Sequence, residues 1–124
     1  MTKESFKEYL ESIGGVYDWR GRNHTNPYIF GVDEGWFDLL KNLIDELLKL
    51  GWNRKVLNSK EKFGGLSLFT ENPTSEMLEV IIKYERLSYT ICEKCGKEGK
   101  PRTGGWIKTL CDYHSELETK KREI

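Results

Sequence analysis

The sequence predicts an α+β protein in which helices pack on a small antiparallel β-hairpin or sheet, with a C-terminal zinc-ribbon-like module. An apolar stripe of helical period runs through residues 35–50, and a glycine-containing turn separates two strand-like runs within residues 53–70. Every cysteine of the chain falls in a Cys/His array between residues 92 and 114. We expect residues 1–90 to form the α+β core and residues 91–124 the module, packed as one unit because no flexible linker separates them.

Residues 35–50 are predicted to form the central helix of the core. Their apolar side chains recur every three or four positions and cover one wide face, as is typical of a helix buried on that side. Asp33 is the expected N-cap, and Gly51 follows the last turn. The other elements are therefore expected to pack on this helix.

Shorter helices are predicted on both sides of the central one. Residues 2–13 show the same spacing and precede a glycine pair, and residues 75–88 follow Thr74 or Ser75, either of which can act as N-cap. A terminal helix over residues 112–123 is expected to begin with Asp112 as its cap and to carry one histidine in its first turn.

An antiparallel hairpin is predicted between the central helix and the next one. Its strands are residues 55–60 and 66–70, and the glycine pair in the turn at 61–65 permits positive φ angles. Residues 16–34 have no regular period and are expected to form a long ordered loop or short irregular strands. Long loops of this kind inside compact domains often carry function.

Cys92, Cys95, Cys111 and His114 form a CxxC…CxxH array, in which two close pairs are separated by fifteen residues. Each short pair makes a tight turn that directs two ligands inward, and the stretch between the pairs folds back as a hairpin. A catalytic zinc ion would need an open coordination position, whereas four protein ligands close the tetrahedron. We therefore predict structural zinc (Zn²⁺), which supplies folding energy to a module too small to fold alone.

Candidate ligand-binding residues fall in three segments that combine basic, aromatic and glycine residues. Lysine and arginine can bind phosphate, glycine-rich turns can present backbone N–H groups to an anion, and aromatic rings can stack on a base. Each segment also has a purely structural interpretation, as a hairpin turn, as a turn whose tryptophan covers a junction, or as ordinary surface charge. The candidates are Lys60, Lys62, Phe63, Gly64 and Gly65 in the first segment, Arg102 and Trp106 in the second, and Trp19 and Arg20 in the third.

Composition and motif content argue against several classes of function. The formal net charge is zero, with 20 basic and 20 acidic side chains, which argues against a strong non-specific nucleic-acid binder but leaves room for a local basic patch. No apolar run reaches the roughly 20 residues that span a bilayer, and the N-terminal segment lacks a signal-peptide core. We expect a cytoplasmic protein with no membrane partner, in which cysteines stay reduced and favour metal over disulfides. We find no nucleophile with its base, so we predict that the protein is not an enzyme.

The segments GWFDLL at 35–40, KEKFGGLSLF at 60–69 and CEKCG…GGW…TLCDYH at 92–114 resemble a family of small, largely uncharacterised phage and prophage proteins. The resemblance covers roughly residues 35–114, and KFGGL is its more particular element. It implies an anti-defence protein that acts in the host cytoplasm as a sponge for a nucleotide immune signal. Such a protein is expected to offer a preformed pocket without catalytic machinery, and often to be a homo-oligomer.

We therefore predict a non-enzymatic protein that binds a small phosphorylated nucleotide. The alternative is a zinc-ribbon adaptor that binds nucleic acid or a host protein. If the KFGGL turn and the Arg102–Trp106 turn line one cavity, they can form a binding site. If they do not, they are two unrelated turns.

Overall fold

The computed structural model describes residues 1–55 and 58–122, with residues 121 and 122 described by their backbone alone. Within this part of the chain, all strands pair as antiparallel hairpins, β1–β2, β3–β4 and β5–β6. The predicted mixed α+β class is confirmed. In chain order the elements are α1 (Lys3–Ser12), β1 (Val16–Tyr17), β2 (Asn23–His24), the 3₁₀ helices η1 (Pro27–Phe30) and η2 (Glu34–Trp36), α2 (Phe37–Lys49), β3 (Asn58–Lys62), β4 (Gly65–Phe69), α3 (Ser75–Ser88), β5 (Lys100–Arg102), β6 (Lys108–Leu110) and α4 (Asp112–Arg122).

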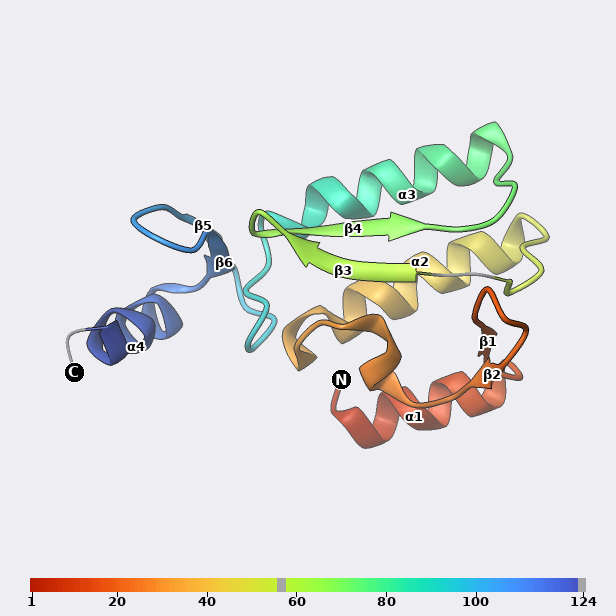
Figure 1. Ribbon diagram of the computed structural model, residues 1–124, viewed down its shortest axis with the longest axis horizontal. Coiled ribbons are helices and arrows are strands. Elements are labelled where there is room, and N and C mark those ends of the chain that lie inside the picture. The colour runs from red at the N-terminus through yellow and green to blue at the C-terminus, as the bar shows by residue number, and fades with distance from the viewer. Residues whose placement is uncertain (56–57, 123–124) are drawn as a thin grey trace.

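Helix α2 is the centre of the core, as its apolar stripe predicts. Figure 1 shows α3 and the β3–β4 hairpin running alongside α2 on one side, with α1 on the other, while β5, β6 and α4 project at one end. The buried side chains of α2 are Phe37, Leu39, Leu40, Leu43, Ile44 and Leu47. Burial of each such side chain stabilises the fold by about 1.5–3 kcal/mol. No helix in the described part of the chain has the length and apolar character needed to cross a membrane.

The predicted helices are present, but the start of the central one differs from the prediction. Helix α2 begins at Phe37 after the short 3₁₀ helix η2, and Asp33 makes no side-chain capping bond there. Instead, the Asp33 carboxylate pairs with Lys94 Nζ at 2.9 Å, and its backbone N–H donates to Glu93 Oε2 at 3.2 Å. The predicted cap is therefore wrong, because a contact with a distant segment occupies this residue. Thr74, in contrast, caps α3 through Met77 N–H, as predicted.

The β3–β4 hairpin is tighter than the sequence predicts. Lys62 pairs with Gly65, which leaves a two-residue turn of Phe63 and Gly64 with φ angles of 53° and 86°. Two positive φ angles characterise a type I′ turn, whose twist matches that of the flanking strands. Strand β3 therefore extends to Lys62 rather than ending at residue 60, and residues 56–57 of the predicted strand lie outside the described residues. The predicted loop at 16–34 contains the short β1–β2 hairpin, η1 and the first residue of η2, Glu34.

Two consecutive acidic residues of α2 bind the helices on its two sides. Tyr9 of α1 donates its hydroxyl proton to Asp45, and Tyr84 of α3 donates to Glu46, which also pairs with Lys83 Nζ at 2.7 Å. Successive positions of a helix point about 100° apart, so neighbouring residues can reach opposite partners. Burial and the Glu46 carboxylate raise the pKa of Tyr84 to about 12.

The C-terminal segment is joined to the core where η2 meets the turn at Cys92–Glu93. Gly35 N–H donates to Glu93 O at 2.8 Å, and the buried Trp36 donates its indole N–H to Ile91 O at 2.9 Å. A Cβ atom at Gly35 would overlap the carbonyl oxygens of Cys92 and Glu93. Only glycine therefore permits this close approach of the two backbones.

We expect Gly35→Ala to destabilise the protein by about 3 kcal/mol, because the added methyl must push two backbone segments apart. Urea unfolding followed by circular dichroism measures the change. Gly51→Ala is the matched control: Gly51 has a φ of 87° but no atom near the added methyl, so about 1 kcal/mol is expected. Equal losses for the two variants would contradict a close contact at Gly35.

We expect the phenol of Tyr84 to stabilise the fold up to about pH 10 and to lose this effect as the pH rises towards 12. Its folded-state pKa of about 12 lies above the unfolded value of about 10, so the neutral form is favoured in the folded state. The ultraviolet absorbance of tyrosinate measures the titration. Tyr84→Phe should remove amplitude from the step near pH 12, and a loss from the step near pH 10 instead would refute the assignment.

Candidate metal centre and adjacent cleft

Cys92, Cys95, Cys111 and His114 place their donor atoms within 4.8 Å of one another. The sulfurs of Cys95 and Cys111 are 3.7 Å apart, and His114 Nδ1 lies 3.3 Å from the Cys111 sulfur and 3.7 Å from that of Cys92. Bonds of about 2.3 Å to sulfur and about 2.0 Å to nitrogen in a tetrahedron give S···S of about 3.8 Å and S···N of about 3.5 Å. The four residues are therefore positioned to hold one metal ion, with a donor set that zinc takes.

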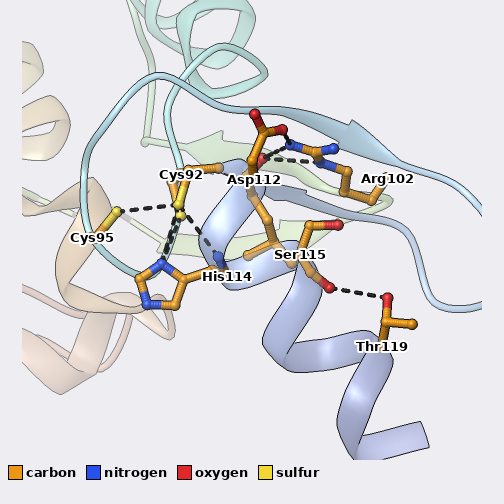
Figure 2. Close-up of polar contacts among 9 residues, drawn as sticks. Cys92, Cys95, Arg102, Asp112, His114, Ser115 and Thr119 are labelled. Atoms are coloured by element: carbon orange, nitrogen blue, oxygen red, sulfur yellow. Dashed lines mark hydrogen bonds and ion pairs between the residues drawn. The ribbon is translucent and has the colours of Figure 1, made fainter. Parts of the chain in front are cut away.

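Local hydrogen bonds explain why each ligand pair converges. In the first pair, Cys92 N–H donates to Lys97 O at 2.7 Å and Gly96 N–H donates to Cys92 O at 2.9 Å. Gly96 has a φ of 82°, so the turn needs a residue that tolerates the left-handed region. In the second pair, the first turn of α4 brings His114 N–H to 3.5 Å from the Cys111 sulfur. Figure 2 shows the sulfurs of Cys92 and Cys95 and the His114 ring gathered around one point, although they come from two segments of the chain.

The cluster also adjusts the acidity of its thiols. The backbone N–H of His114 lowers the pKa of the Cys111 thiol to about 6, with help from the imidazole. Desolvation of the sulfur raises the pKa of Cys95, although the residue itself is exposed. Because the thiolate is the form that binds metal, the lowered pKa favours the metal-binding form of Cys111.

Arg102, a predicted phosphate ligand, has its donors engaged within the C-terminal segment. Its guanidinium donates to Leu110 O at 3.0 and 3.1 Å and to Asp112 Oδ1 at 2.8 Å, and Figure 2 shows the side chain turned towards Asp112. The hydrogen bond from Arg102, and then its charge, lower the pKa of Asp112, which is the first residue of α4. Arg102 lines a separate surface depression together with Lys100 and Asp112.

Phe63 and Trp106 line one cleft of about 380 Å³, although they belong to different hairpins. Their side chains are 72% and 73% exposed, respectively. Lys62 lies beside them, with its Nζ 5.9 Å from the centre of the Phe63 ring, and the Trp106 indole N–H donates to Glu61 Oε1 at 3.3 Å. The KFGGL turn thus shares a cavity with Trp106 but not with Arg102. Gly105 and Ile107 complete the lining of this cleft.

A buried hydrogen bond links the two turns of the cleft. The Thr109 hydroxyl on β6 donates to Gly64 O at 2.6 Å, and a Cβ atom at Gly64 would lie 2.9 Å from the Ile107 side chain. Sequence reasoning missed Thr109, because a threonine in a strand gives no signal of a partner elsewhere. It also missed Glu93, whose pKa is raised by burial. The sequence places Glu93 between the metal ligands Cys92 and Cys95, where an exposed turn is expected.

The remaining candidates lie away from this cleft. Trp19 and Arg20 occupy the turn between β1 and β2, where the Arg20 guanidinium lies 4.8 Å from the Trp19 ring centre. Figure 1 shows the β1–β2 hairpin at the opposite end of the molecule from β5 and β6. Lys60 is exposed on β3, and Gly65 pairs with Lys62 at the start of β4. The structure therefore brings Lys62, Phe63 and Trp106 together and places the other candidates around or apart from them.

Comparison of the chain with models of protein families, with curated proteins and with solved structures gave no match. Function is therefore inferred from the chemistry of the metal centre and the cleft.

We expect His114→Ala to abolish stoichiometric metal binding and to lower the melting temperature, because it removes one of four ligands that hold the C-terminal segment. His24→Ala is the matched control, since the other histidine of the chain bonds Asp18 at 2.8 Å and takes no part in the cluster. Metal analysis and the visible spectrum of the cobalt-substituted protein measure binding. Retention of one tightly bound ion by the His114 variant would contradict the site.

Proposed function

We propose that the protein is a non-enzymatic binding protein in which a structural zinc ion holds one wall of a ligand cleft. The observation that carries this proposal is the position of Phe63 and Trp106, two exposed aromatic side chains from separate hairpins that line the same cleft. Rings exposed to this extent do not gain the free energy of apolar burial. A ligand that stacks on them would bury their faces and gain that free energy. The Cys/His cluster supports a structural role for zinc, because four protein donors leave no open position for chemistry.

The ligand in this proposal is a small phosphorylated nucleotide. Its base would stack on Phe63 or Trp106, since aromatic rings accept any base by its π-face. Lys62 lines the cleft, and Lys60 lies two positions before it on the same strand, so both ammonium groups are available to phosphate. The remaining predicted cations, Arg102 and Arg20, are engaged with Asp112 and stacked on Trp19, and we assign them no role at the cleft.

Charge on the far side of Trp106 favours one orientation of such a ligand. The neighbouring depression is lined by four carboxylate residues and one lysine beside Trp106. Like charges repel, so phosphates are expected on the Lys62 side and the base towards Trp106. The carboxylate residues are Asp33, Glu61, Glu93 and Glu118. Asp33 is paired with Lys94 and burial raises the pKa of Glu93, so the repulsion comes from Glu118 and from Glu61, which also lines the cleft beside Trp106.

The resemblance to phage and prophage proteins supplies a biological setting for this proposal. A preformed cleft without catalytic groups is what a sponge for a host nucleotide signal requires. The protein would then act by holding the signal away from its receptor, in proportion to its own concentration and affinity.

We expect calorimetry with a panel of cyclic nucleotides and ADP-ribose derivatives to find a ligand that the metal-loaded protein binds in a one-to-one ratio. Trp106→Ala should weaken binding by about 5- to 150-fold, because base stacking contributes about 1–3 kcal/mol. Trp19→Ala is the matched control, since Trp19 is 74% exposed but lies in the β1–β2 turn. Absence of heat with every compound, or equal losses in both variants, would refute the proposal.

A further inference from the structure

The β3–β4 hairpin presents one face to solvent, which we call the outer hairpin face. Burial alternates along β3, with Asn58, Lys60 and Lys62 exposed and the residues between them covered. The register sets these three opposite Phe69, Ser67 and Gly65 of β4. Directly opposed residues of an antiparallel pair share a face. The outer hairpin face therefore consists of Asn58, Lys60, Lys62, Gly65, Ser67 and Phe69.

Helix α3 adds an aromatic ring to this face. A Cβ atom at Gly65 would overlap the ring of Tyr89, so this ring occupies the space above Gly65 where a side chain would otherwise stand. Tyr89 remains partly exposed, and Phe69, four residues along β4, is 61% exposed. Four residues of a strand span about 13 Å, which leaves room for a planar group at each ring.

The charge of the outer hairpin face is positive. Its two charged residues are Lys60 and Lys62, and no ion pair holds either ammonium group within residues 1–55 and 58–122. The two positions are about 7 Å apart along the strand. Glu61 alternates to the opposite face, and Glu85 of α3 accepts the Leu68 N–H at 2.9 Å. Glu71, two residues beyond Phe69, is exposed, so the positive charge is confined to the part of the face that holds Lys60 and Lys62.

We propose that the outer hairpin face binds single-stranded nucleic acid, with bases stacked on Phe69 and Tyr89 and phosphates at Lys60 and Lys62. The bases must be unpaired. In a duplex each base is stacked between its neighbours, so an aromatic side chain on a sheet face can stack only on a base of a single strand. Complementary charge selects a polyanion over an apolar partner, and the spacing of the rings selects a chain over a single nucleotide. This site is independent of the cleft in its aromatic residues, Phe69 and Tyr89, and shares Lys60 and Lys62 with the phosphate side of the cleft.

The test is fluorescence anisotropy of a labelled oligothymidine of about ten nucleotides with the full-length, metal-loaded protein. We expect binding to the single strand and little to a duplex of the same length. Two neutralised phosphates give a salt slope of about −1.4, so the affinity should fall about sevenfold between about 50 mM and about 200 mM salt. Equal affinity for the duplex, or no binding to the single strand, would overturn the proposal.

Substitutions locate the binding site. Phe69→Ala should weaken oligonucleotide binding about tenfold, whereas Tyr28→Ala, which removes a 62% exposed ring elsewhere, should leave it unchanged. Lys60→Gln should reduce the salt slope by about 0.7, and Lys7→Gln, on the exposed side of α1, should not. If Phe69→Ala alters folding, the comparison of Lys60→Gln with Lys7→Gln still tests the proposal. Unchanged binding in both Phe69→Ala and Lys60→Gln would show that the strand binds elsewhere.

Trp106→Ala separates this site from the cleft. We expect this variant to lose nucleotide binding and to keep oligonucleotide binding, and Phe69→Ala to show the reverse. Oligonucleotide binding that depends on Trp106 and not on Phe69 would overturn the outer hairpin face as the site. Binding of the oligonucleotide without binding of any small nucleotide would refute the proposed function and support this one.

Discussion

The contact between Gly35 and the backbone of Cys92 and Glu93 is the constraint on which the other features depend. It holds the first turn leading into α2, the most buried helix, against the turn that presents two of the four metal ligands. Trp36 strengthens the same contact by donating its indole N–H to Ile91 O. The Asp33–Lys94 ion pair and the Thr109–Gly64 hydrogen bond hold the same segment against the core at two further points. The metal centre is thus an anchored part of the fold rather than an appendage.

The C-terminal hairpin uses this anchor to form a surface that neither hairpin has alone. Thr109 reaches Gly64 O from β6, so the turn that carries Trp106 is fixed against the turn that carries Phe63. Charged groups of both signs surround the resulting cleft, with Glu61 and Lys62 in its lining and further carboxylates in the depression next to Trp106. A chain whose total charge is zero can therefore present local fields of opposite sign within a short distance.

Local patterns predict much of this architecture, and contacts between distant residues explain what they miss. The helical stripe of α2 and the CxxC and CxxH spacings are encoded within a few residues of each other, so the central helix and the metal ligands are predictable. Asp33 departs from its predicted role as N-cap because it bonds Glu93, sixty residues away. Arg102 pairs with Asp112 instead of lining the cleft, and no rule based on neighbouring residues predicts this pairing.

The hydrogen bond between Thr109 and Gly64 has a thermodynamic consequence. It joins the segment that carries the Cys/His cluster to one wall of the cleft, so under the proposed function metal binding and cleft occupancy would belong to a single linked equilibrium. Linkage is reciprocal: whatever factor the metal contributes to affinity at the cleft, an occupant of the cleft must return as tighter retention of the metal. The rate at which a chelator strips the ion would then report on events at Phe63 and Trp106 without any probe placed there.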